Sequence, residues 1–188
     1  FYPTKNLAAI GDGGAVVTSD ATTAERCRRL RQYGWSERYV VGEAGWNSRL
    51  DEIQAAVLRG RLKTLDARNA RRREIAGAYA MALAGGTAEL MFRDESSHVG
   101  HLAVMRTPER DAFRANLKER GISTDIHYPV SDDNQLIWRT RSDYDVVDGG
   151  LPETHQAIGE ILSLPCFPEL TDLEVETVCE ALLDWAAR

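Results

Sequence analysis

Residues 1–18 read FYPTKNLAAIGDGGAVVT, and this stretch decides how the fold is interpreted. A single lysine, Lys5, follows a proline-threonine corner and precedes a turn of three glycines and one aspartate at residues 11–14. Glycine adopts backbone angles that other residues resist, and aspartate favours turns. The run Ala15–Thr18 that follows is rich in strand-forming residues. We therefore expect a strand, a turn and a second strand at the start of the chain.

Downstream of this stretch, predicted helices and strands alternate. Helices are expected at residues 21–33, at residues 50–83 with a break near Gly60, at residues 109–120, from residue 151 through Leu162, and from residue 171 onward; strands are expected at residues 102–105 and 122–126. The last helix opens with a capping box, and its predicted buried stripe is Leu173, Val175, Val178, Leu182 and Trp185. Residues 35–49 and 131–150 have no clean period and are expected to form loops. This alternation, with a glycine linker at residues 84–86, predicts the α/β class.

The composition excludes several classes of function. The chain has 188 residues, 43% hydrophobic and 28% charged, with a net charge of -6 that argues against a nucleic-acid surface. Arginine clusters at residues 26–29 and 71–73 are interpreted as solvated helix faces. No apolar run approaches the ~20 residues of a membrane span, and no signal peptide is recognised. We expect a cytoplasmic protein whose three cysteines are reduced thiols, with no nucleic-acid or membrane partner.

No metal site is expected. His98 and His101 lie close together in sequence, but no acidic or cysteine ligand accompanies them, so a structural role is the better interpretation. Cys166 has no basic neighbour in sequence that would activate its thiol, and we assign it no nucleophilic role.

Lys5 is the first candidate for chemistry. Taken by itself, a lysine at this place is more often a solvated side chain than a catalytic one. The whole string from Tyr2 to Gly14, however, resembles the cofactor-lysine segment of the DegT/DnrJ/EryC1/StrS family of sugar aminotransferases, which use pyridoxal 5'-phosphate (PLP). The resemblance implies that Lys5 binds PLP covalently and moves a proton during the reaction. It also favours transamination over dehydration, because a related dehydratase branch carries histidine at this position.

The second candidate is the string NSRLDEIQAA at residues 47–56. Read locally, Ser48 or Asp51 caps a helix, and Asn47 presents an amide near the positive helix end, a favourable place for a phosphate. The resemblance implies that Asn47 reaches across a homodimer interface to the PLP phosphate of the neighbouring subunit. For Arg49 two roles stay equally open, orienting the substrate or pairing with an acid.

The third candidate is the string TDIHYPV at residues 124–130. From the residues alone, a buried and hydrogen-bonded structural pair is the better interpretation of His127 and Tyr128. The resemblance implies that both approach a sugar-nucleotide pocket, which Tyr2 shares. This version of the motif looks most similar to the branch that aminates C3 of a nucleotide-linked keto-6-deoxy sugar.

The resemblance covers nearly the whole chain and implies its domain organisation. The expected fold is α/β, the carboxy-terminal part of a fold-type I PLP-dependent transferase. Residues 1–60 are expected to end the large PLP-binding domain, residues 61–84 to form a connecting helix, and residues 85–188 to form a small carboxy-terminal α/β domain. Because no initiator methionine is present, the amino-terminal half of such an enzyme is expected to be missing.

The resemblance also implies a function. The complete enzyme is expected to be a homodimer that transfers an amino group from glutamate to a nucleotide-linked keto sugar, in amino-sugar, antibiotic or glycan biosynthesis. The alternative is a non-catalytic fragment, or a regulatory or dimerisation relative that keeps the fold without turnover.

Overall fold

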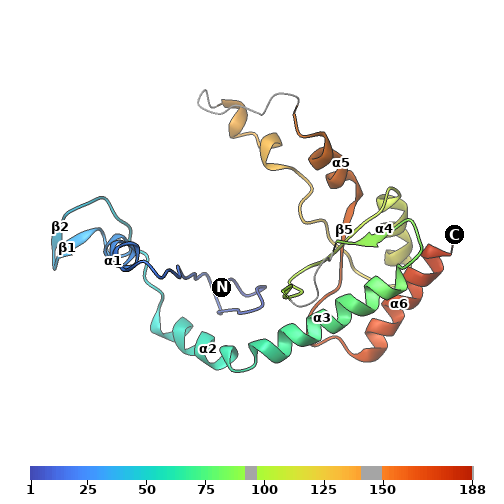
Figure 1. Cartoon of the computed structure of the whole chain (residues 1–188), viewed down its shortest axis with the longest axis horizontal. Coiled ribbons are helices and arrows are strands. Elements are labelled where there is room, and N and C mark those ends of the chain that lie inside the picture. The colour runs from blue at the N-terminus through green and yellow to red at the C-terminus, as the bar shows by residue number, and fades with distance from the viewer. Residues whose placement is uncertain (92–96, 141–149, 188) are drawn as a thin grey trace. The chain divides into compact units, whose positions relative to one another are not determined.

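The computed structural model describes residues 1–91, 97–140 and 150–187. Contacts within the chain separate two compact units, Phe1–Asp66 and Ala67–Arg188, which we call the first and the second unit (Figure 1). The division expected above, into residues 1–60, 61–84 and 85–188, stays a prediction. None of the described helices combines the length and the apolar character that a membrane crossing needs.

The first unit contains two helices and a short hairpin. Its elements are α1 (Ala21–Leu30), β1 (Trp35–Glu37), β2 (Val40–Val41) and α2 (Glu52–Leu62). The carboxylate of Asp20 caps α1 by accepting hydrogen bonds from the backbone N–H groups of Thr22 and Thr23. Helix α1 ends at Leu30, earlier than the predicted end at Tyr33, because the chain turns back after Leu30. The N–H of Trp46 donates to the carbonyl of Leu30 at 2.8 Å.

Two predictions for the first unit are wrong. Neither of the two strands expected within residues 1–18 forms; no described segment pairs with the backbone of Ala15–Thr18, and Val17 is 94% exposed. The segment 35–49, expected as a loop, contains the antiparallel hairpin β1–β2. Its two-residue turn ends at Tyr39, which has a φ of 70°. Hairpin turns with positive φ usually contain glycine or asparagine, and because neither is present here the sequence did not indicate a hairpin.

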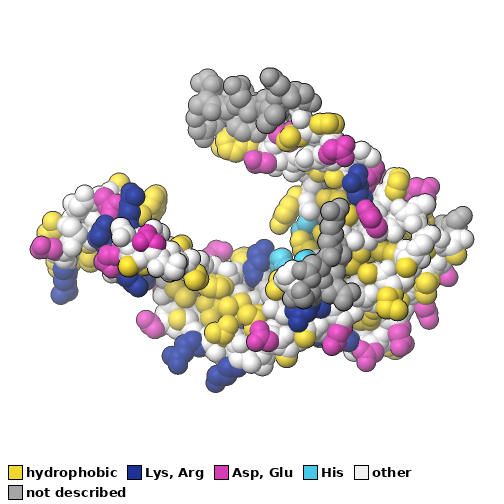
Figure 2. Space-filling view, viewed as in Figure 1, with side chains coloured by type: hydrophobic (Ala, Val, Ile, Leu, Met, Phe, Trp, Pro, Cys, Tyr) yellow, Lys and Arg dark blue, Asp and Glu magenta, His cyan; other side chains and the backbone are white. Residues whose placement is uncertain are grey.

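The first unit has almost no core of its own. Its buried hydrophobic side chains are those of Ala8, Ala9 and Leu58, while large apolar side chains are exposed, among them Ile10, Val16, Val17, Tyr39, Trp46 and Ile53. Figure 2 shows hydrophobic side chains gathered over the part of this unit that contains α2. An apolar surface of this kind normally marks a contact with another protein surface.

The second unit is built on a three-stranded antiparallel sheet with strand order β3-β4-β5. Its elements are α3 (Leu65–Ala82), β3 (Glu89–Leu90), β4 (Ala103–Arg106), α4 (Arg110–Glu119), the 3-10 turns η1 (Asp132–Asn134) and η2 (Trp138–Thr140), α5 (Pro152–Glu160), β5 (Ile161–Leu164) and α6 (Asp172–Ala186). Side chains of α3, α4, α6 and the two longer strands form one hydrophobic core. On β5, Leu162 and Leu164 face this core, so Ser163 between them faces the opposite side of the sheet.

Several predictions for the second unit can be compared with these elements. The Thr171 capping box is confirmed, as is the buried stripe of α6 except at Leu173, which lies outside the packed face and is 72% exposed. The predicted helix from residue 151 ends at Glu160, because Ile161 and Leu162 pair with β4 as a strand. The strand expected at residues 122–126 is reduced to a single bridge between Asp125 and Ser163. Of the loop expected at residues 131–150, the part from 141 to 149 lies outside the described residues.

Candidate functional site

Lys5 lies on a segment that folds back on itself. The backbone N–H of Lys5 donates to the carbonyl of Tyr2 at 2.9 Å, and the N–H of Ala9 donates to the carbonyl of Phe1 at 2.7 Å. The backbone nitrogen of Phe1 in turn donates to the carbonyl of Gly13 at 2.7 Å. These bonds close the segment into a loop that presents the side chains of Lys5 and Tyr2 to solvent.

Helix α2 holds this loop in place. Nη1 of Arg61 donates to the carbonyl of Ala8 at 2.8 Å, and the N–H of Ile10 donates to Oε1 of Gln54 at 2.9 Å. Lys5 is therefore displayed from an anchored backbone, with its own side chain exposed. A lysine amine becomes a good nucleophile when it is desolvated. The first unit, which the structure describes in full, does not form the walls that would enclose this amine.

Asn47 lies where the two ends of the segment that carries the β1–β2 hairpin come together, at residues 30–34 and 45–47, which we call the neck. Its backbone forms an isolated antiparallel bridge with Gln32. The neck is tight, because a Cβ added at Gly45 would lie 2.2 Å from the backbone nitrogen of Gly34. The bridge and the close approach fix the backbone of Asn47 where the chain passes from α1 toward α2.

The side chains of Asn47 and Arg49 line an open cavity of about 1030 Å³ in the first unit, together with Asp51 at the N-cap of α2. Nε of Arg49 donates to Oδ1 of Asn47 at 3.1 Å, and its guanidinium carbon lies 5.8 Å from the centre of the Tyr33 ring. Among the described residues, Arg49 forms no ion pair and Nδ2 of Asn47 has no partner. An amide donor and a guanidinium suit a phosphate. The lining also contains two further arginines against two carboxylates, so its positive groups outnumber its negative ones and the cavity fits the phosphate of PLP chemically; these residues are Arg28, Arg31, Asp12 and Asp51.

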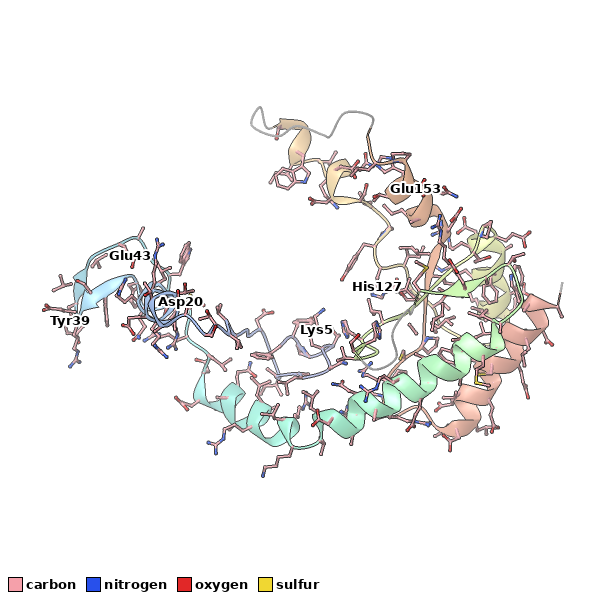
Figure 3. The ribbon with its side chains drawn as sticks, in the orientation of Figure 1. Lys5, Asp20, Tyr39, Glu43, His127 and Glu153 are labelled. Carbon is pink, nitrogen blue, oxygen red and sulfur yellow. The ribbon has the colours of Figure 1, made fainter. Side chains whose placement is uncertain are left out.

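Lys5 and Asn47 do not meet within one chain. Lys5 does not line the cavity of Asn47. Figure 3 shows Lys5 well apart from Asp20 and Glu43, which mark the end of the first unit that carries α1 and the hairpin. The two residues that were predicted to hold one cofactor therefore belong to different places of the first unit.

The side chain of His127 lines a smaller cavity, of about 340 Å³, in the second unit. Its Nδ1 lies 2.9 Å from Oγ of Ser163, and its Nε2 lies 3.7 Å from Oδ2 of Asp125. Tyr128 does not line this cavity. Its side chain is 65% exposed, and its ring meets the His127 ring edge-on with the centroids 5.3 Å apart. A buried structural pair therefore does not describe Tyr128, whereas His127 is partly buried and hydrogen-bonded.

The thiol of Cys166 lines the same cavity and is not activated. Burial raises the pKa of Cys166, although the guanidinium of Arg72 lies nearby. Arg72 itself is only 8% exposed and donates to the carbonyls of Gly100 and Cys166. The solvated helix face predicted for this arginine cluster is therefore wrong at Arg72, because its guanidinium ties α3 to two neighbouring loops.

A polar cluster that the sequence did not indicate joins η1 to α5. Nε2 of His155 lies 2.7 Å from Oδ2 of Asp133, and Nδ2 of Asn134 donates to Oγ of Ser131 at 2.9 Å. The hydroxyl of Ser131 and the imidazole of His155 hold the pKa of Asp133 below its usual range. Among the described residues, no group of three histidine, cysteine, aspartate or glutamate side chains is placed to hold a metal ion.

Known proteins match the chain over almost its full length. The DegT/DnrJ/EryC1/StrS aminotransferase family matches residues 1–183. The dTDP-3-amino-3,4,6-trideoxy-alpha-D-glucose transaminase of Streptomyces venezuelae is 43% identical over 190 residues, which is 100% of this chain and 49% of the relative. The pleiotropic regulatory protein of Geobacillus stearothermophilus is 39% identical over 189 residues, which is 98% of this chain and 50% of the relative. The chain thus spans about half the length of the curated relatives it matches.

Solved structures agree with these matches. The crystal structure of S. venezuelae DesV in complex with a ketimine intermediate has a TM-score of 0.89 and 42% identity, covering 100% of this chain and 50% of that one. The structure of ntda from Bacillus subtilis with bound cofactor pmp has a TM-score of 0.87 and 28% identity, covering 100% of this chain and 45% of that one. The expected fold, the carboxy-terminal part of a fold-type I PLP-dependent transferase, is confirmed. The chain belongs to the DegT/DnrJ/EryC1/StrS aminotransferase family, whose cofactor is PLP.

Proposed function

We propose that the full protein is an aminotransferase that acts on a nucleotide-linked keto-6-deoxy sugar in amino-sugar biosynthesis. The segment around Lys5 resembles the family's cofactor-lysine motif, and its loop is anchored by hydrogen bonds to α2. A 43% identical relative is named as a transaminase of a dTDP-linked 3-amino sugar, which supports amination at C3. We assign glutamate as the amino donor and the cytoplasm as the compartment.

Each candidate residue has a role in this proposal. PLP, when bound, supplies the electron sink that an amino-group transfer needs. Nζ of Lys5 would hold the cofactor and carry the proton that moves during transfer. Nδ2 of Asn47 would donate to the cofactor phosphate. Tyr2, Arg49, His127 and Tyr128 would bind and orient the sugar nucleotide.

The separation of Lys5 from the cavity of Asn47 carries the proposal that the enzyme is a homodimer. If both residues serve one cofactor, a single chain that keeps them apart cannot build the site alone. A second copy that supplies Asn47 in trans completes the site. The exposed apolar side chains of the first unit offer a surface for such an assembly.

Mixing two inactive variants tests this arrangement. Full-length Lys5→Ala and Asn47→Ala are each expected to lose transfer from glutamate to a dTDP-linked keto sugar. A mixture refolded together is expected to regain activity, because a mixed dimer contains one site with both native residues. No recovery in a mixed dimer demonstrated by mass spectrometry would overturn action in trans.

The visible absorbance of lysine-bound PLP tests the cofactor role separately. The full-length protein is expected to show this band after incubation with PLP, and Lys5→Ala is expected to lose it. The position of the amino group in the product, read by NMR, decides between C3 and the neighbouring C4.

A regulatory role is the second candidate, because a 39% identical relative is named as a pleiotropic regulatory protein. It predicts that the full-length protein binds PLP without transferring an amino group to any keto sugar nucleotide. Measurable turnover would exclude a purely regulatory role.

A further inference from the structure

Ser163 is held rigidly beside His127. It lies in β5, where Val104 of β4 pairs with it on one side and Asp125 on the other. Two backbone hydrogen bonds join Asp125 and Ser163, at 3.2 Å and 2.7 Å. Both neighbours fix its backbone, and its side chain faces the side of the sheet opposite the core. Ser163 is 5% exposed, and its Oγ lies 2.9 Å from Nδ1 of His127.

The side chains of Ser163 and Asp125 lie on either side of the His127 ring, but the three do not form a nucleophilic triad. In a hydrolytic triad the serine faces the substrate and the aspartate is buried behind the histidine. Here the order of burial is reversed, since Ser163 is buried and the side chain of Asp125 is 75% exposed. Ser163 is therefore placed to orient His127 rather than to attack a substrate.

The two neighbours of the imidazole determine where its proton resides. The carboxylate of Asp125 lies 3.7 Å from Nε2, beyond hydrogen-bond distance, so its charge favours a proton on that nitrogen without occupying the N–H as its acceptor. With the proton on Nε2, Nδ1 is an acceptor, and the hydroxyl of Ser163 donates to it. A serine hydroxyl can donate or accept, so distance alone does not select the tautomer. Nδ1 of His127 is, however, the one partner of Ser163 Oγ among the described residues, so donation to Nδ1 is the arrangement that leaves no buried hydroxyl proton unpaired.

We propose that Ser163 is a positioning residue that fixes His127 as the Nε2–H tautomer and orients this ring nitrogen as a hydrogen-bond donor in the 340 Å³ cavity. Building on the proposed function, the acceptor is an oxygen atom of the sugar-nucleotide substrate. Ser163 acts through His127 and does not touch the substrate itself.

NMR of the histidine ring nitrogens tests the tautomer without any substrate. In the ¹⁵N-histidine-labelled full-length protein, the ring signals of His127 are assigned by their loss in His127→Gln. The native protein is expected to show the Nε2–H pattern. Ser163→Ala is expected to show a mixture of tautomers, and Ser163→Thr, which restores a hydroxyl, to return toward the native pattern. Thr107→Val is the matched control, since it removes a hydroxyl that is equally buried and has no partner among the described residues.

Kinetics of the two half-reactions separate positioning from general damage. Ser163→Ala is expected to raise KM for the keto sugar nucleotide on the order of fivefold, as for one lost hydrogen bond. The half-reaction with glutamate alone is expected to keep its native rate. An Nδ1–H tautomer in the native protein, an unchanged tautomer in Ser163→Ala, or equal loss in both half-reactions would each overturn the proposal. Absence of turnover in the native protein would count against the proposed function alone, and the NMR spectra would still decide the role of Ser163.

Discussion

The two units of the chain differ in how they use their apolar side chains. The second unit buries its own in a continuous core that joins α3, α4, α6 and the sheet. The first unit carries Lys5, Asn47 and Arg49, yet it buries few apolar side chains and exposes several large ones. The second unit is therefore stabilised mainly from within. The first unit displays the residues of the proposed site on a surface suited to contact with another surface.

Removing the centre of the second unit's core is expected to have the largest effect. Phe113 and Trp185 stack with their ring centroids 4.6 Å apart and both side chains buried. Trp185→Ala is expected to lower the free energy of unfolding of this unit by about 3–5 kcal/mol. Urea unfolding of the full-length protein, followed by circular dichroism, measures the change. Leu183→Ala, at a 53% exposed position of the same helix, is the control. A loss at Trp185 no larger than the loss at Leu183 would contradict a self-sufficient core.

Adding a methyl group at Gly100 is expected to lower the free energy of unfolding of the second unit by less than Trp185→Ala does, but by a measurable amount. Gly100 has a φ of 58°, and an added Cβ would lie 2.7 Å from Cβ of Arg72. Gly100→Ala therefore combines left-handed strain with a clash, and we expect a loss of about 2–4 kcal/mol. Gly121→Ala shares the positive φ but has open space around it, so about 1 kcal/mol is expected there. Equal losses in the same urea experiment would show that the contact with Arg72 is unimportant.

The smallest expected effect is a difference in acid sensitivity between helix α1 of the first unit and helix α6 of the second. The hydroxyl of Thr23, followed by the backbone N–H groups of Thr23 and Thr22, lowers the pKa of Asp20 from its ordinary value of 3.8. A lowered pKa means that the cap stabilises α1 above this ordinary value and is lost as the pH falls through the lowered value. Helix α1 has no buried residue, so it is expected to fray at acid pH while α6, which packs on the core, stays protected.

Amide hydrogen exchange between about pH 5 and pH 2 measures this fraying, after correction for intrinsic exchange rates. Asp20→Asn keeps a capping side chain without a titrating group, and it is expected to reduce the pH dependence of α1 to the part that comes from the ion pairs of its arginines with Glu43 and Glu25. Protection of α1 that is independent of pH in the native protein would show that the cap contributes little.

Local signals predicted part of the molecule well. The capping box at Thr171 and most of the buried stripe of α6 follow from residues close in sequence, and the structure confirms them. The α/β class followed from the alternation of elements. Lys5 and Asn47 could be selected because family motifs surround them. Their roles stay predictions, since no contact in one chain brings them together.

The features that sequence analysis missed depend on partners distant in sequence. The contact between His127 and Ser163 joins residues 36 positions apart, and that between Asp133 and His155 joins residues 22 positions apart. No local pattern encodes either contact. The short apolar run at Ile161 fits a helix as well as a strand from sequence alone, and its pairing with β4 makes it a strand.

The neck that closes the segment between α1 and α2 has a consequence for sequence variation. The pairing of Leu30 with Trp46, the bridge from Gln32 to Asn47 and the close approach at Gly45 all lie below the hairpin. Insertions or deletions at the hairpin tip near Tyr39 therefore need not move Asn47. We expect homologous chains to vary freely in length at the tip while keeping a glycine and an asparagine where the two ends of this segment meet.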